Sequence, residues 1–220
     1  MTCRLCAVLW FFVSLQLKIY AMSKKKIALI VIALLVIDQV VKIMIKTNMT
    51  INEAITVFPS WFFIRFIENP GAAFGMQIGG EFGKLALSIF RLALSGALIW
   101  YICKLIKKQA PAGVVMGFGL ILAGALGNII DSAFYGLIFS ESTYTQAAAF
   151  VPFGTGYAGF LHGKVVDMLY FPLVSGVYPS WFPFVGGDSF TFFSPIFNIA
   201  DSYITIGVLY LIIFQRKYFK

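Results

Sequence analysis

Charged residues are scarce in this 220-residue chain. Asp, Glu, Lys and Arg together make up 12% of the sequence, whereas a soluble domain carries about 25%. Hydrophobic residues make up 60%, which is more apolar surface than a soluble core of this size can bury. The high hydrophobicity excludes a disordered chain, and both values together exclude a soluble globule. The composition indicates a polytopic membrane protein.

Cysteine and histidine are also rare, which limits the chemistry available. Cys3, Cys6 and Cys103 cannot form a disulfide framework. His162 is the single histidine, so a zinc site lacks the cluster of His and Cys ligands that it needs. A Ser-His-Asp triad would have to use His162, for which a loop or interfacial position is the simpler interpretation. No glycine-rich phosphate loop ending in GK[ST] is present. We therefore expect neither a metal nor a cofactor.

Four apolar segments are long enough to cross the hydrocarbon core as helices, which takes about 20 residues each. They cover approximately residues 27–45, 85–103, 113–131 and 197–214. Residues 1–21 are interpreted as an N-terminal extension, because Met22 opens a basic MSKKK segment that leads straight into the first span. A cleaved signal peptide is the alternative, although it would leave that basic segment outside. The remaining residues, 22–220, are expected to form one membrane domain.

Basic residues set the expected orientation. The chain has 17 Lys and Arg against nine Asp and Glu, a formal net charge of +8. In a soluble protein this excess would suggest a nucleic-acid partner; in a membrane protein it indicates sidedness, so no nucleic acid is expected. Basic clusters precede the first span and follow the second and the fourth, and no acid lies in these segments. By the positive-inside rule, both termini are predicted to be cytoplasmic.

The two predicted outer loops, 46–84 and 132–196, differ in character. The run from Trp61 to Ile67 is aromatic and β-branched, which predicts a strand that follows a turn at Pro59. The second loop is rich in aromatic residues, as is typical of the membrane–water interface, and residues 140–163 within it have the character of an insertion. The predicted fold is thus an all-α, four-helix membrane protein with a small β-rich extracytoplasmic cradle and an aromatic outer loop.

Four aspartates are predicted to lie at one depth, in the outer third of the bilayer. Asp38 lies towards the outer end of the first span, Asp131 ends the third, Asp201 is close to the start of the fourth, and Asp167 lies in the second outer loop. Acids in membrane helices are costly and by default mark a functional site. The convergence therefore predicts a site at the outer side of the helix bundle.

The neighbours of these acids are ordered along the helices. Asp38 and Lys42 are four residues apart and share a helix face, which predicts a neutralising structural pair. Asn128 and Asn198 each precede an aspartate by three residues. A stripe of small residues (Gly113, Gly117, Gly124) leads to Asp131, and because small residues face other helices, Asp131 should point into the bundle.

Two neighbouring carboxylates in a site of low dielectric share one proton. One can then take a proton from water while the other protonates the attacked carbonyl oxygen, which is aspartic-protease chemistry. From the residues alone, a non-catalytic role remains open for each of these acids. Asp167 could simply be solvated in its loop, and Asp201 could be favoured by the dipole at the start of its helix. The alternative function is a small ion-coupled carrier, which predicts acids along the whole bilayer depth and repeated or broken helices.

Five separated motifs occur in a fixed order: DQVVK (38–42), ENPGAAFGM (68–76), GALGNIID (124–131), GKVVDML (163–169) and FNIADSYITIG (197–207). On these motifs the sequence resembles the lipoprotein signal peptidase (signal peptidase II) family over approximately residues 24–215. The resemblance implies a monomeric, multi-pass aspartic endopeptidase of the bacterial cytoplasmic (inner) membrane. Its substrates would be prolipoproteins that carry diacylglycerol on a cysteine, cut just before that cysteine among membrane lipids at the outer, periplasmic face.

The resemblance also assigns residue roles. It implies that Asp167 and Asp201 are catalytic and that Asp38 and Lys42 form a structural polar pair. Five further residues would position the catalytic pair and hold the substrate backbone: Asn69, Gly71, Asn128, Asp131 and Asn198.

The sequence departs from the family in two places. Ser132 stands where the family usually has arginine, and Arg65, Lys164 and Arg91 are the candidates to replace that charge. The second departure is the long outer loop, in segments 140–163 and 174–195.

Overall fold

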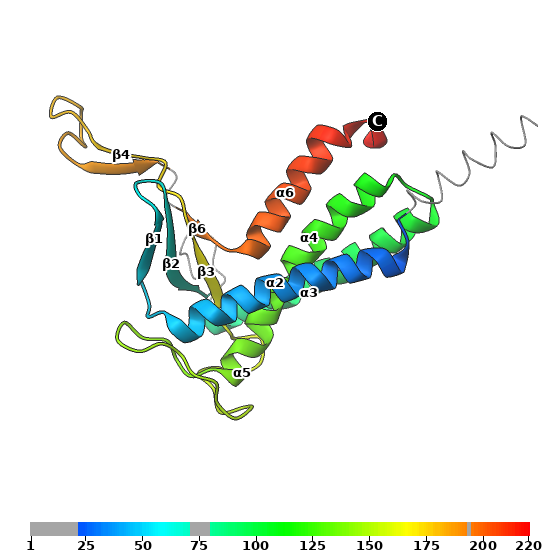
Figure 1. Ribbon diagram of the computed structural model, residues 1–220, viewed down its shortest axis with the longest axis horizontal. Helices are drawn as coiled ribbons and strands as arrows, with labels where there is room; N and C mark the ends of the chain where they lie inside the picture. Colours follow the sequence, from blue (N-terminus) through cyan, green and yellow to red (C-terminus); the bar gives the residue numbers. More distant parts are fainter. Residues whose placement is uncertain (1–21, 71–79, 193–194) are drawn as a thin grey trace, which may run out of the picture.

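A computed structural model describes residues 22–70, 80–192 and 195–220. Among these residues, three helices are long and apolar enough to cross a membrane: α2 (Lys24–Asn48), α3 (Gly80–Lys107) and α4 (Ala112–Ile130) with its continuation to Ile138. A fourth apolar helix, α6 (Ile199–Phe214), has 16 residues. The positions of the four predicted apolar segments therefore correspond to four helices, of which three reach spanning length (Figure 1).

The prediction that the third span ends at Asp131 is wrong. The helix continues through a π-helical turn, η2 (Asp131–Tyr135), into the short helix α5 (Gly136–Ile138). No proline interrupts residues 131–138, so nothing in this stretch prevents a helical backbone. π-Helical turns inside α-helices occur frequently at functional sites. Here the turn holds Asp131 within the helix rather than at its end.

The start of the fourth helix also differs from the predicted span of 197–214. Ile196–Phe197 form a short strand, β6, and Asn198 is the N-cap of α6 with an extended backbone. The Asn198 side chain accepts a hydrogen bond from the Asp201 amide (2.8 Å), and the Asp201 carboxylate accepts one from the Asn198 amide (3.2 Å). This reciprocal capping box fixes the carboxyl group of Asp201 at the first turn of α6.

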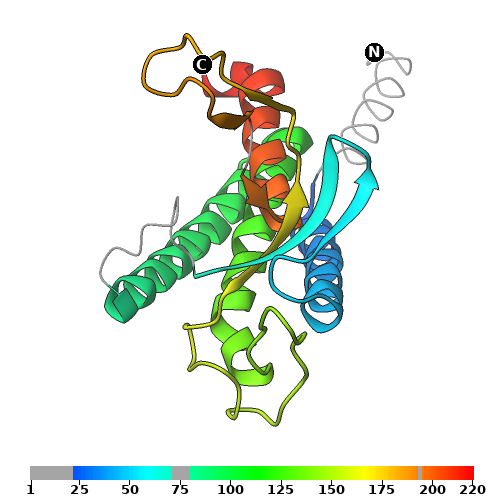
Figure 2. The ribbon, with the colours of Figure 1, turned by 90° about the vertical axis from the view of Figure 1, so that its left-hand side faces the viewer.

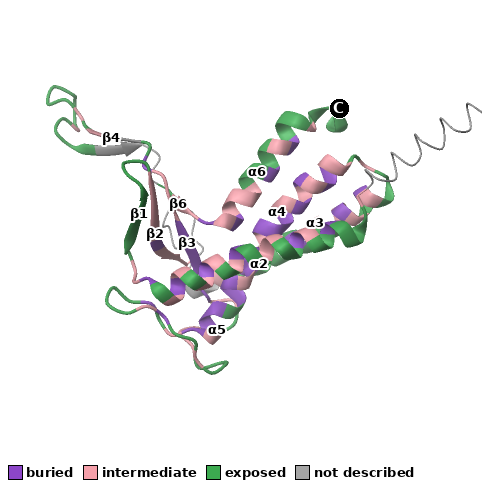
Figure 3. Cartoon of the chain, in the orientation of Figure 1, coloured by how far each residue is buried: buried purple, intermediate pink, exposed green. Residues whose placement is uncertain are grey.

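Helix α4 is the centre of the bundle and contacts α2, α3 and α6. Its glycines allow α6 to approach closely: a Cβ atom at Gly124 would collide with the Ala200 carbonyl oxygen, and one at Gly117 with Leu211. The prediction that the small-residue stripe faces another helix is thus confirmed. The opposite faces of α2, α3 and α6 expose many apolar side chains (Figure 3), including Leu29 and Trp100.

A four-stranded antiparallel sheet lies at one end of the helices (Figures 1 and 2), in the order β1-β2-β3-β6. It contains β1 (Ala54–Phe58), β2 (Phe62–Asn69) and β3 (Val165–Tyr170) besides β6. The strand predicted around 61–67 is confirmed as β2. β2 and β3 are joined through pairs such as Glu68–Val166 and Asn69–Val165, so the ENPG and VVD motifs meet at one end of the sheet.

The long outer loop forms two separate structures. Residues 174–192 form a projecting hairpin of β4 (Val174–Val177) and β5 (Ser189–Phe192) (Figure 1). The predicted insertion, 140–163, lies beside the end of α4 and α5 and is closed by a bridge between Phe139 and Phe150. Buried side chains that include Phe66, Tyr135 and Met168 form a small core at this end of the molecule.

Candidate active site

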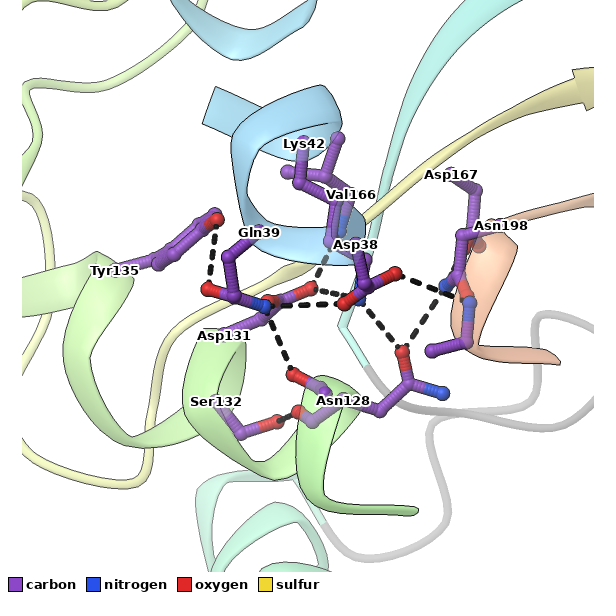
Figure 4. Close-up of polar contacts among 12 residues, drawn as sticks. Asp38, Gln39, Lys42, Asn128, Asp131, Ser132, Tyr135, Val166, Asp167 and Asn198 are labelled. Atoms are coloured by element: carbon purple, nitrogen blue, oxygen red, sulfur yellow. Dashed lines mark hydrogen bonds and ion pairs between the residues drawn. The ribbon is translucent and has the colours of Figure 1, made fainter. Parts of the chain in front are cut away.

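A buried charged cluster joins α2 to α4, and Figure 4 shows its polar contacts. Lys42 Nζ lies 3.1 Å from Asp38 Oδ2 and 2.8 Å from Asp131 Oδ2, and all three side chains are fully buried. The predicted Asp38–Lys42 pair is therefore present, and Asp131 points into the bundle as expected. Two carboxyl groups therefore share one ammonium group in this part of the site.

Gln39 and Tyr135 complete this cluster, and sequence reasoning did not single them out. Gln39 Nε2 donates to Asp131 Oδ1 (2.9 Å) and to Asp38 Oδ2 (3.1 Å), while its Oε1 accepts a hydrogen bond from the Tyr135 hydroxyl (3.2 Å). The available signal was the position of Gln39 beside Asp38 within the DQVVK motif. The role of Tyr135 required the helical continuation beyond Asp131.

The charged cluster positions the backbone immediately before each predicted catalytic acid. The Val166 amide donates to Asp131 Oδ2 (3.3 Å), and the Ala200 amide donates to Asp38 Oδ1 (3.0 Å). Val166 directly precedes Asp167 on β3, and Ala200 directly precedes Asp201 on α6. The two aspartates of the cluster thus fix the strand and the helix that carry the two predicted catalytic aspartates.

Three asparagines connect the predicted catalytic pair. Asp167 accepts hydrogen bonds from Asn198 Nδ2 (2.7 Å) and Asn69 Nδ2 (3.2 Å), and Asp201 accepts one from Asn128 Nδ2 (2.8 Å). Since Asn198 Oδ1 also accepts a hydrogen bond from the Asp201 backbone amide, one side chain contacts the Asp167 carboxylate and the backbone of Asp201. The structure therefore brings together all the predicted supporting residues except Gly71, which lies outside the described residues.

Asn128 ties the pair to the charged cluster. Its Oδ1 accepts hydrogen bonds from Lys42 Nζ (2.9 Å) and Asn198 Nδ2 (3.0 Å), while its Nδ2 donates to Asp201. One amide thereby contacts the cation of the cluster and one member of the pair. The four aspartates predicted to share one depth form a single connected polar network.

The environment of Asp167 favours its protonated form. Burial raises the pKa of this carboxyl group from its ordinary value of 3.8 to about 7, and the negative charge of Asp201 adds to the rise. Hydrogen bonds from Asn198 and Asn69 act in the opposite direction but are outweighed. Asp167 can therefore keep a proton close to neutral pH.

The position of the missing arginine is occupied by Ser132, whose hydroxyl donates to the Asn128 carbonyl oxygen (3.1 Å). Of the three predicted replacements, Arg65 lies against the Tyr170 ring, and Lys164 pairs with Glu68 (3.3 Å). Arg91, on α3, lies within electrostatic range of Asp201 and Asp167. Arg91 is therefore the candidate placed to supply positive charge to the pair.

A second buried ion pair, not anticipated from the sequence, lies beside Asn69. Lys46 Nζ forms an ion pair with Glu68. The Ser142 hydroxyl accepts a hydrogen bond from Lys46 Nζ (3.0 Å) and donates one to Glu68 Oε1 (2.9 Å). Glu68 directly precedes Asn69 on β2. Ser142 belongs to the insertion, so this contact joins the insertion to the strand that carries Asn69. The adjacency of Glu68 to the asparagine was the only signal in the sequence.

Comparisons with known proteins identify the family of this chain. The family model described as "Signal peptidase (SPase) II" matches residues 30–216. The lipoprotein signal peptidase of Porphyromonas gingivalis is 49% identical over 190 residues, which cover 86% of this chain and 82% of that protein. The lipoprotein signal peptidase of Amoebophilus asiaticus is 38% identical over 200 residues, 89% of this chain and 80% of that protein.

A solved structure described as a bacterial membrane enzyme is also similar, with a TM-score of 0.56 and 27% identity, covering 88% of this chain and 94% of that one. The family model extends over all five motifs. The chain therefore belongs to the signal peptidase II family.

Proposed function

We propose that this protein is an aspartic endopeptidase that removes signal peptides from diacylglyceryl-modified prolipoproteins by cutting just before the lipidated cysteine. The observation that carries the proposal is that the Asn198 side chain contacts both the Asp167 carboxylate and the backbone of Asp201, in a setting where burial and the charge of Asp201 raise the pKa of Asp167 to about 7. Family membership supports the substrate class. It leaves the carrier alternative without support.

The two acids take different roles in the proposed reaction. Ionised Asp201, which is half-buried, removes a proton from the attacking water. Protonated Asp167 donates its proton to the oxygen of the scissile carbonyl, so that a neutral tetrahedral diol forms. Collapse of the diol breaks the C–N bond: Asp201 passes its proton to the leaving amine, and Asp167 regains a proton from a hydroxyl group of the diol, which restores the starting pair. No metal or cofactor takes part in this scheme.

The surrounding residues keep this geometry in place. Asn69, Asn128 and Asn198 hold the carboxyl oxygens, and Asp131 fixes β3 ahead of Asp167. Asn69 and Gly71 are further proposed to hold the substrate backbone. Pre-organised groups of this kind lower the barrier because they need no rearrangement during the reaction.

We place the protein in the bacterial inner membrane with four spans, both termini in the cytoplasm and the catalytic pair at the outer face. The basic clusters at 24–26, 104–108 and 216–220 support this orientation. Asp201 lies in the first turn of α6, at the opposite end of that helix from the basic residues 216–220, which supports a position on the outer side. A substrate anchored by its own acyl chains reaches this depth from the lipid.

The sheet is proposed to cover the substrate from outside. Stacked aromatic rings, including Phe58 with Trp61 (centroids 5.1 Å apart) and Phe62 with Phe171 (4.5 Å), present an apolar surface on it. We propose that the loop 52–82 and the aromatic hairpin close over the lipidated peptide. A monomer is sufficient, since all the proposed site residues come from one chain.

A cleavage assay tests the proposal. Purified protein in detergent is mixed with a diacylglyceryl-modified prolipoprotein and, in parallel, with its unlipidated precursor, and the products are separated by gel shift. Cleavage of the lipidated form alone, lost in Asp167→Asn and Asp201→Asn, is expected. Equal cleavage of both precursors would refute the substrate class, and near-normal turnover by either variant would refute the catalytic pair.

A further inference from the structure

A groove between α4 and α6 lies at the end of the bundle away from the sheet (Figure 1), remote from the catalytic pair. We propose that it binds an anionic phospholipid, with an acyl chain in the groove and the phosphate on Arg216 and Lys220. The inference does not depend on the proposed protease function.

The groove has the size and lining that an acyl chain requires. Its volume is about 530 Å³, within the range of about 300–1,000 Å³ typical of ligand sites. Phe118 and Ile121 line it from α4, and Val208, Leu211 and Ile212 line it from α6. No polar side chain is among these five, so the groove favours a hydrocarbon ligand.

The chain folds back to close the groove at its basic end. After α6, the 3₁₀ turn η3 (Arg216–Phe219) reverses direction, and the Phe219 ring packs edge-on against Phe118 with centroids 6.3 Å apart. This turn brings Arg216 and Lys220 to the same groove. The stems of two basic side chains therefore line this end of the apolar groove, and their flexible charged ends can reach a phosphate at its mouth, as in a phospholipid headgroup above its acyl chain.

Charge complementarity selects an anionic lipid. Neither α4 (residues 112–130) nor residues 202–220, which together supply the lining of the groove, contain an acidic side chain. Arg216 and Lys220 therefore have no acidic side chain in these segments to neutralise them. Basic pockets between membrane helices on the cytoplasmic side are suited to anionic headgroups. The diacylglycerol of a prolipoprotein carries no phosphate for these cations, so the substrate's lipid does not fit.

Native mass spectrometry of the detergent-purified full chain tests the site, with phosphatidylglycerol and phosphatidylcholine of the same acyl chains as probes. The double variant Arg216→Gln/Lys220→Gln removes both groove cations. Lys107→Gln/Lys108→Gln removes two cations from the same end of the molecule but outside the groove, and is the matched control. Val208→Trp fills the groove while leaving every charge in place.

Phosphatidylglycerol is expected to bind wild type and the Lys107/Lys108 control equally, and at least about 10-fold more weakly to the Arg216/Lys220 variant. Phosphatidylcholine should bind wild type more weakly than phosphatidylglycerol does. Val208→Trp should weaken phosphatidylglycerol binding as well, with an unchanged melting temperature in detergent verifying its fold.

Equal losses in the two double variants would show general surface attraction and overturn the site. Equal binding of the two lipids, or full binding by a folded Val208→Trp protein, would overturn it too. A second copy of the chain in the groove would instead appear as a dimer that Val208→Trp converts to a monomer.

Discussion

The buried carboxyl group of Asp167 makes the stability of the protein depend on pH. Its pKa is 3.8 in an ordinary setting and about 7 in the fold. Between about pH 4 and 7 the folded protein therefore holds a proton that the unfolded chain has released, so the contribution of Asp167 to stability falls as the pH rises through this window and is constant above it. Asp167→Asn removes this dependence and should stabilise the protein under alkaline conditions.

The expected size follows from the shift and the lost contacts. At about 1.4 kcal/mol per pKa unit, ionised Asp167 costs about 4 kcal/mol at pH 8 and less than half of that at pH 5. An asparagine at position 167 keeps one oxygen, which can still accept the hydrogen bond from Asn198. Its amide nitrogen replaces the oxygen that accepts from Asn69, so that hydrogen bond, worth about 1 kcal/mol, is lost. Asp167→Asn should therefore gain about 3 kcal/mol at pH 8 and almost nothing at pH 5.

Thermal unfolding in detergent at pH 5 and pH 8 measures this difference. The matched control is Asp188→Asn, which removes an exposed acid from the projecting hairpin and should change the melting temperature little at either pH. A higher melting temperature of Asp167→Asn at pH 8 but not at pH 5 is the expected result. The reasoning about burial would be refuted if Asp167→Asn differed from wild type in melting temperature by the same amount at both pH values. It would also be refuted if the variant were less stable than wild type at pH 8.

Three further predictions concern activity and assembly. The rate of cleavage should fall as the pH rises through about 7, because Asp167 loses the proton it donates, and a profile that is flat from pH 5 to 9 would contradict this. Lys42→Met leaves two buried carboxylates without their cation and should destabilise the fold by about 3–5 kcal/mol, seen as loss of folded protein on size-exclusion chromatography. Arg91→Gln should lower turnover about 10-fold and Arg91→Lys less, because the positive charge of Arg91 favours the ionised form of Asp201 that the proposed mechanism needs. Arg65→Gln is its control, and equal losses in Arg91→Gln and Arg65→Gln would exclude a specific role.

The positions of the helices and the clustering of the four aspartates could be predicted because both follow from simple physical rules. Apolar segments of membrane length mark the helices, and a buried acid needs a partner, as Asp38 finds in Lys42. The strand β2 was visible from its aromatic and β-branched residues. Spacing along one helix predicts which residues share a face, and the glycines of α4 followed that rule.

Contacts between distant segments could not be predicted in the same way. From residues alone, Asp167 had no assigned partner, and only the resemblance linked it to Asp201. The structure supplies the physical reason: pairing of β3 with β2 brings Asn69 to Asp167, and the N-cap of α6 brings Asn198. The ion pair between Lys46 and Glu68 joins residues whose proximity depends on the fold.

The helical continuation past Asp131 was missed for a local reason. Residues 113–131 alone supply the approximately 20 residues that a membrane span needs, so the span was predicted to end at Asp131. The π-helical turn is stabilised by tertiary contacts that place Tyr135 in the small core and Asp131 beside Lys42. Tertiary packing thus overrides local propensity at this point.

The central claim is that Asp167 and Asp201 perform the chemistry while Asp38 and Asp131 hold them in place. The most direct test is the turnover of lipidated prolipoprotein by the four single Asp→Asn variants, each normalised to its folded fraction. Asp167→Asn and Asp201→Asn should lose about 10³-fold or more in turnover while remaining folded. Asp38→Asn and Asp131→Asn should lose mainly folded protein and keep measurable turnover per folded molecule. Retained turnover in either of the first two variants, with turnover abolished in a folded Asp38→Asn or Asp131→Asn protein, would contradict the account.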